Sequence, residues 1–113
     1  MNILRTLLGA GGKPLAPAQY KQDFVEGHRA HTLLDVRSPM EFRSGHLAGA
    51  VNIDVQVLGT RLAELPKDKP IVVYCQSGSR SGMAASALER AGFSEAYDLG
   101  GLIGCVRAGL PVR

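Results

Sequence analysis

The 113-residue sequence contains no tryptophan, and aromatic residues make up only 5% of it. This composition argues against a base-stacking surface for single-stranded nucleic acid. The net charge is +3, and the 13 Lys and Arg residues are spread along the chain without a dense run. Because a nucleic-acid module usually concentrates its basic residues on one stripe, we expect no nucleic-acid partner and only weak steering of small anions.

Cysteine and histidine are scarce as well. The two cysteines, Cys75 and Cys105, are too few for a disulfide framework or a cysteine-based zinc site. The three histidines, His28, His31 and His46, do not complete a ligand set with metal spacing. The sequence therefore predicts no metal site.

Long apolar stretches are also missing. No segment approaches the roughly 20 apolar residues that cross a bilayer, and the apolar start of the chain is short and interrupted by Arg5. We therefore predict no membrane partner and a cytoplasmic, reducing location. Residues 1–14 are predicted to form an N-terminal arm on a single domain of residues 15–113.

What the sequence does contain is an alternation of short apolar strands and helices. The predicted strands are residues 32–36, 50–53, 71–74 and 96–99. The predicted helices are residues 18–26, a short helix from the capping box of Ser38 and Glu41 to Gly45, residues 55–65, residues 81–91, and a final turn from residue 100 to residue 109. This order predicts an α/β domain with a mainly parallel sheet, and the apolar run 71–74 suits a strand buried on both faces.

The loop after that run, residues 75–81 with the sequence CQSGSRS, carries the candidate chemistry. Ligand sites of such sheets lie at the carboxyl ends of the strands. Small residues let backbone N–H groups converge on an anion beside the start of a helix, which favours a Cys75 thiolate with a lowered pKa. Arg80 can offer a cationic fork to an anionic substrate. The alternative is an inert buried cysteine followed by a tight turn.

Three ordered stretches resemble the signatures of the single-domain rhodaneses, a sulfurtransferase family. They are LDVRSPMEF (34–42) with GHLAGAVNI (45–53), VYCQSGSRS (73–81), and LGG (99–101) with GLPV (109–112). The resemblance covers nearly everything from Leu15 onward, and it implies a five-stranded, mainly parallel sheet flanked by helices on both faces. Cys105 stands where the family usually carries tryptophan. We expect it to fill the core, with sulfur relay from Cys75 as the alternative.

The resemblance also implies a mechanism without a cofactor. Cys75 would take the outer sulfur of thiosulfate or a persulfide donor as a persulfide, and a thiol, cyanide or a sulfur-accepting protein would then remove it. The residues implied in holding the donor are Gln76, Ser77, Gly78, Ser79 and Arg80.

Two other functions stay open. One is a rhodanese-like module that carries sulfur or regulates a partner without its own turnover. The other is a cysteine phosphatase, which ranks lower because related phosphatases have one residue more than the six from Cys75 to Arg80 and because this loop has no acidic residue.

The supporting candidates are polar residues close to the loop. Asp35 and Arg37 flank one residue of a strand end, so their side chains point the same way. We expect them to form an ion-pair network with Glu41 or a loop backbone, which would help to fix the cysteine loop, rather than to act in catalysis.

The serines and histidines have structural interpretations of their own. The hydroxyls of Ser77, Ser79 and Ser81 could donate to the anion, while Ser79 or Ser81 could equally cap the helix. His46 is expected to be a hydrogen-bonded structural residue, with a general-base role as the alternative. We expect the remaining two histidines, His28 and His31, to be solvated.

Overall fold

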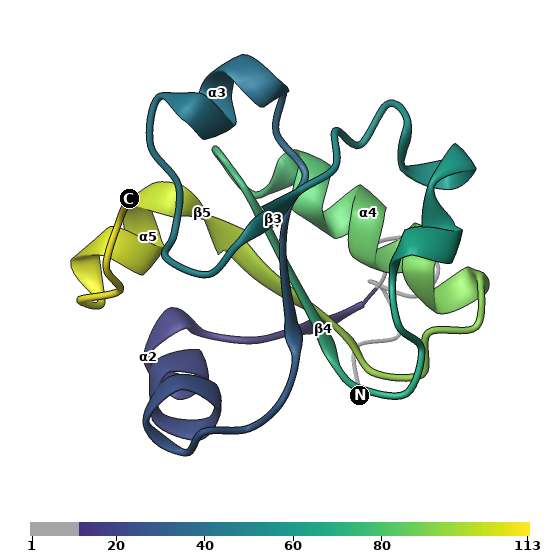
Figure 1. Cartoon of the computed structure of the whole chain (residues 1–113). Helices are drawn as coiled ribbons and strands as arrows, with labels where there is room; N and C mark the ends of the chain where they lie inside the picture. Colours follow the sequence, from purple (N-terminus) through teal and green to yellow (C-terminus); the bar gives the residue numbers. More distant parts are fainter. Residues whose placement is uncertain (1–11) are drawn as a thin grey trace.

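The structure, a computed structural model, describes residues 12–113, which build a five-stranded sheet in the order β1-β5-β4-β2-β3 (Figure 1). Every neighbouring pair of strands is parallel, so the predicted α/β class is confirmed. The strands are β1 (Lys13–Pro14), β2 (Thr32–Asp35), β3 (Val51–Asn52), β4 (Ile71–Cys75) and β5 (Ala96–Gly101).

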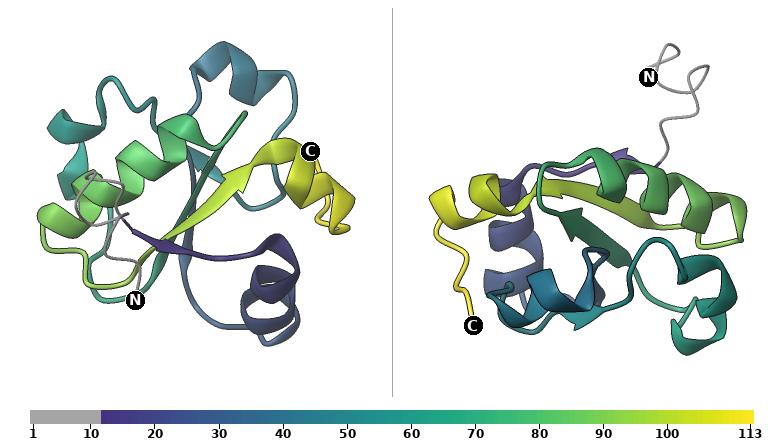
Figure 2. Two further views of the ribbon diagram at one scale, coloured as in Figure 1. Left: turned by 180° about the vertical axis from the view of Figure 1, so that it is seen from behind. Right: turned by 90° about the horizontal axis from the view of Figure 1, so that it is seen from above.

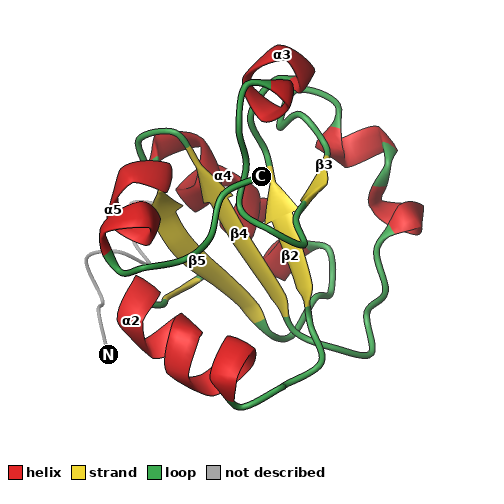
Figure 3. Cartoon of the chain, turned by 60° about the vertical axis from the view of Figure 1, so that its left-hand side comes forward, coloured by secondary structure: helices red, strands yellow, loops and turns green. Residues whose placement is uncertain are grey.

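Helices connect the strands and cover both faces of the sheet. They are α2 (Pro17–Tyr20), which continues as the π-helix η1 (Lys21–Glu26), α3 (Pro39–Arg43), the 3-10 helices η2 (Leu58–Thr60) and η3 (Leu62–Glu64), α4 (Ser79–Arg90) and α5 (Leu102–Arg107). Figure 2 shows α4 beside β4 and β5, and Figure 3 shows α2 and α5 on the opposite side of the sheet. No helix within residues 12–113 is long and apolar enough to cross a membrane.

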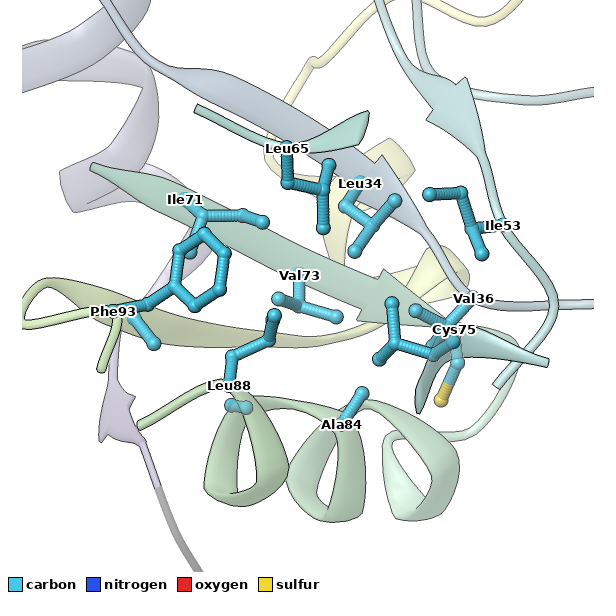
Figure 4. Packing of buried hydrophobic residues seen from close by; sticks show 13 residues of the cluster. Leu34, Val36, Ile53, Leu65, Ile71, Val73, Cys75, Ala84, Leu88 and Phe93 are labelled. Atoms are coloured by element: carbon cyan, nitrogen blue, oxygen red, sulfur yellow. The ribbon is translucent and has the colours of Figure 1, made fainter. Parts of the chain in front are cut away.

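The central strand β4 explains this layering. Its side chains alternate, so Ile71, Val73 and Cys75 join one core cluster with α4 (Figure 4), while Val72 and Tyr74 join a second cluster on the other face. All five residues of β4 are buried, as a strand covered on both faces requires. Burying each large apolar side chain contributes about 1.5–3 kcal/mol, so the edge where the cysteine lies is firmly anchored.

The predicted helix over residues 55–65 is wrong. The backbone N–H of Val55 donates to the carbonyl oxygen of Val36, which ties the start of the segment to the end of β2 instead of to a helix. Gly59 then lowers helix propensity inside the segment. Two 3-10 turns result, and they still place Leu58 and Leu65 in the core.

The last strand is longer than predicted. Gly100 and Gly101 end β5, Gly101 is also the N-cap of α5, and the register against β4 shifts between Val73 and Tyr74. Gly100 has a φ of 91°, which a glycine adopts without strain.

The fifth strand, β1, lies within the predicted arm. Lys13 pairs with Tyr97 and Pro14 with Asp98, so these two residues complete the sheet at one edge. Proline is tolerated there because an edge strand leaves one side unpaired. Residues 1–11 of the predicted arm lie outside the described residues, and the domain boundary stays a prediction.

Candidate active site

Cys75 is the last residue of β4, whereas the sequence predicted it as the first residue of the following loop. Its side chain has no exposed surface. Its sulfur lies beside the first turn of α4 (Figure 4). The backbone N–H groups of Gly78 and Ser81 donate to Sγ at 3.0 and 3.3 Å. Gly78 has a left-handed φ of 101°. These two donors would stabilise negative charge on the sulfur.

Ser81 links Cys75 to a carboxyl group that the sequence did not suggest. Its buried hydroxyl oxygen lies 3.5 Å from Cys75 Sγ, 3.0 Å from the carbonyl oxygen of Gly78 and 2.8 Å from Asp98 Oδ1. Asp98 also accepts the N–H of Gly100 at 3.0 Å. Only the order of the strands brings Asp98 here, because β5 lies next to β4, and no local sequence pattern indicates that order.

Asp35 and Arg37 form the expected ion pair beneath the loop. Their side chains are 0% and 3% exposed, and Arg37 Nη2 donates to Asp35 Oδ2 at 2.7 Å. The same guanidinium donates to the carbonyl oxygen of Gly45 at 2.6 Å and to Gln76 Oε1 at 3.0 Å. The pair therefore contacts the first loop residue after the cysteine, and its supporting role at the site stays a prediction.

The predicted partner Glu41 is not part of that pair. Its carboxylate instead accepts both terminal nitrogens of Arg80, with Nη1 2.7 Å from Oε1 and Nη2 3.0 Å from Oε2. Of the two alternatives expected for the Asp35 and Arg37 network, Glu41 or a loop backbone, the structure shows the second, through the Gly45 carbonyl oxygen. The capping box of Glu41 with Ser38, which the structure confirms, leaves the Glu41 carboxylate facing α4. Figure 1 shows α3, which carries Glu41, beside the end of β4.

This ion pair perturbs the titration of both partners. Hydrogen bonds from Arg80 and from the Ser38 N–H lower the pKa of Glu41 to about 2. The hydrogen bond to Glu41 raises the pKa of Arg80, with smaller electrostatic contributions from Cys75 and Asp54. Arg80 therefore lies within electrostatic range of the sulfur, but its cationic fork is already occupied by a carboxylate of the same chain.

The loop serines do not cap α4. Gly78 is the N-cap and supplies no side chain, so the capping role considered for Ser79 and Ser81 is wrong. Ser77 and Ser79 are exposed, and their hydroxyl oxygens lie 3.3 Å apart. Both hydroxyls stand at the solvent side of the loop.

The histidines have structural surroundings. His46 stacks on Phe42, and its Nδ1 lies 2.8 Å from the carbonyl oxygen of that residue, in agreement with the structural role predicted. His28 is exposed, as expected. His31 is only partly solvated, because it is half-buried and its Nε2 lies 2.8 Å from the hydroxyl of Tyr20. The sequence prediction missed this contact between a helix and the loop that follows it.

Cys105 fills the core, as predicted. It is fully buried in the cluster on the face of the sheet opposite Cys75, and burial raises its pKa to about 12. A neutral thiol separated from Cys75 by the sheet is poorly placed for sulfur relay.

Among residues 12–113, no three side chains of the metal-binding types gather into a possible metal site.

Comparison with known proteins agrees with this architecture. A family model described as a rhodanese-like domain matches residues 16–103. The chain belongs to the rhodanese-like domain family. A crystal structure of a rhodanese-related protein from Thermoplasma volcanium superposes on this rhodanese-like domain with a TM-score of 0.78 and 30% identity, covering 89% of this chain and 97% of that one. The predicted fold is therefore confirmed.

Several similar proteins are named sulfurtransferases. A sulfurtransferase of Allochromatium vinosum is 37% identical over 71% of this chain and 76% of its own length. The thiosulfate sulfurtransferase GlpE of Pseudomonas aeruginosa is 34% identical over 77% of this chain and 76% of its own length. The uncharacterised protein YqhL of Bacillus subtilis is 44% identical over 72% of this chain. The matched segment covers 64% of the length of YqhL.

Proposed function

We propose that this rhodanese-like domain is a sulfurtransferase that carries sulfane sulfur on Cys75. The observation that carries the proposal is the position of the sulfur, at the end of the central strand with the N–H groups of Gly78 and Ser81 directed at it. A thiolate held in this way is a suitable nucleophile for a sulfane sulfur. The sulfurtransferase names of the relatives support the same reaction class.

In the first half of the proposed reaction, Cys75 Sγ forms a bond to the outer sulfur of thiosulfate or of a persulfide. The donor's sulfur–sulfur bond breaks, and its inner part leaves as sulfite or a thiolate with the bonding electron pair. In the second half, a thiol, cyanide or a sulfur-accepting protein attacks the outer sulfur, and Cys75 leaves as a thiolate. The N–H groups of Gly78 and Ser81 are positioned to stabilise that leaving sulfur.

Access to the sulfur requires local movement. Because Cys75 has no exposed surface, a donor reaches Sγ only when the loop of residues 76–80 shifts. Three of these residues, Gln76, Ser77 and Ser79, are exposed and so are free to meet the donor first. Arg37 holds Gln76 from below, so the supporting ion pair would limit how far the loop opens.

The decisive experiment is intact-mass measurement after incubation with thiosulfate or cysteine persulfide. We expect the gain of one sulfur atom, lost in Cys75→Ser and retained in the matched control Cys105→Ser. Loading of sulfur with negligible turnover to cyanide would favour the carrier module. No loading, combined with hydrolysis of an aryl phosphate, would favour the phosphatase.

A further inference from the structure

Two arginines, one in the loop and one in contact with it, are each paired with a carboxylate. Arg37 pairs with Asp35, and Arg80 pairs with Glu41 through two hydrogen bonds. Asp54 adds a second acidic influence on Arg80. Each guanidinium group therefore already binds a carboxylate through two of its nitrogens, and neither fork is left for an incoming oxyanion.

This charge balance bears differently on the two donor classes. Attack of the Cys75 thiolate on thiosulfate, a dianion, brings three negative charges together in the site. After the reaction, one charge is on the Cys75 persulfide and two are on sulfite. Attack on an organic persulfide, R–S–SH, gathers one charge, or two when the persulfide is ionised. Like charges brought together in a partly desolvated site repel strongly unless a cation compensates them. The paired arginines therefore penalise thiosulfate more than they penalise an organic persulfide.

The surroundings of the loop also suit an organic donor. Three exposed apolar side chains, Met40, Met83 and Ile103, are 71%, 59% and 63% exposed. They lie near the starts of α3, α4 and α5, the helices that follow β2, β4 and β5. All three are therefore placed toward the carboxyl edge of the sheet, where the cysteine loop lies. Apolar surface there can contact the carbon skeleton of a donor, which thiosulfate lacks.

We infer that Glu41 determines donor class, and that the preferred donor is an organic persulfide rather than thiosulfate. This inference rests on the proposed sulfurtransferase function. In the step concerned, Cys75 Sγ bonds to the outer sulfur of R–S–SH, and R–S⁻ leaves with the electron pair of the broken bond. The proton stays on the transferred sulfur, and no external oxidant or reductant takes part. Glu41 acts through Arg80 as a positioning residue, because its carboxylate occupies the fork that a dianion would need.

The test compares donors in the full chain with cyanide as the common acceptor. The probes are thiosulfate, cysteine persulfide, and a small protein persulfidated on one cysteine. Glu41→Gln removes one negative charge while its amide oxygen can still accept the Ser38 N–H. The matched control is Glu64→Gln, which breaks the exposed pair of Glu64 with Arg61 at a distant 3-10 helix.

In the wild type we expect kcat/KM to be higher for both persulfides than for thiosulfate. In Glu41→Gln the ratio of kcat/KM for thiosulfate to that for cysteine persulfide should rise about tenfold, mainly through a lower KM for thiosulfate. Glu64→Gln should leave the ratio unchanged. Glu41→Ala provides a second variant, and thermal melting establishes that each variant is folded.

Each outcome has a definite meaning. Two results would overturn the inference while the sulfurtransferase function stands. One is a higher kcat/KM for thiosulfate than for either persulfide in the wild type, and the other is an unchanged donor ratio in both folded Glu41 variants. Failure of every donor to load Cys75 overturns the proposed function itself. If an organic persulfide is preferred, the persulfide with the higher kcat/KM shows whether the donor is a small molecule or a protein. A lower kcat/KM in Met83→Ser for the protein donor alone supports a protein donor.

Discussion

The hydroxyl oxygen of Ser81 lies 2.8 Å from Asp98 Oδ1, and on its other side it lies 3.5 Å from the sulfur of Cys75. A hydroxyl has one proton and two acceptor positions. While its proton points to Asp98 or to the carbonyl oxygen of Gly78, the oxygen can accept from the Cys75 thiol. Donation to a Cys75 thiolate requires the proton to turn away from both of these acceptors. We therefore expect the direction of the Ser81 proton to depend on the charge state of the Cys75 sulfur.

The first prediction concerns this hydroxyl. Ser81→Ala should lower the single-turnover rate of sulfur loading about tenfold, because a hydrogen bond to a charged sulfur contributes about 1.5–3 kcal/mol. The rate is followed by quenched intact-mass measurement with saturating donor. Ser44→Ala is the control, since its exposed hydroxyl donates to the carbonyl oxygen of Met40 in its own helix turn. Equal loading rates in wild type and Ser81→Ala would contradict the role given to the hydroxyl.

The second prediction concerns the ion pair beneath the loop. Asp35→Asn should lower the free energy of unfolding by about 3–5 kcal/mol, because it leaves the buried guanidinium of Arg37 without its charged partner. Urea denaturation measures the loss. Replacing both residues with apolar side chains, as in Asp35→Leu with Arg37→Met, should recover a large part of it. A loss below about 1 kcal/mol in Asp35→Asn would mean that the pair does not anchor the loop.

The third prediction is a pH dependence of stability. The pKa of Glu41 is lowered from 4.5 to about 2, so its ionised form favours the folded state. That contribution is complete above pH 4.5 and is lost as the pH falls from 4.5 toward 2. Wild type should therefore lose stability more steeply in this window than Glu41→Gln, as measured by the urea midpoint at each pH. Parallel curves for the two proteins would show that the Arg80 contact is not maintained in solution.

How well the sequence predicted the molecule depended on the distance between interacting residues along the chain. The strand 71–74, the capping box of Ser38 and Glu41, and the pair of Asp35 and Arg37 were all predicted, and each rests on residues at most three positions apart. Such features follow from backbone periodicity and local hydrogen bonding. The cysteine loop was located for the same reason, since it directly follows the most apolar strand.

Contacts between distant segments were missed. Glu41 and Arg80 are 39 residues apart, and Ser81 and Asp98 are 17 apart. Their pairing depends on which strands are neighbours in the sheet and on which way each helix returns. The two-residue strand β1 was missed because an edge strand of this length has no periodicity to detect.

The last prediction concerns the second cysteine. Burial raises the pKa of Cys105 to about 12, and its cluster lies on the other face of the sheet from Cys75. In Cys75→Ser, the remaining thiol should therefore fail to react with a thiol reagent until urea unfolds the chain. Cys105→Ala should load sulfur at the wild-type rate while losing about 1 kcal/mol of stability, because it removes only one buried atom.

Peptide mapping after sulfur loading completes this test. The added sulfur should lie on the peptide that contains Cys75 and be absent from the one that contains Cys105. Sulfur found on Cys105 in the folded wild type would establish a relay between the two thiols. Such a relay would require the sulfur to pass across the sheet, because each thiol is fully buried in the cluster on its own face. A relay that becomes faster at urea concentrations well below the unfolding midpoint would then identify local opening of the α5 face as its route.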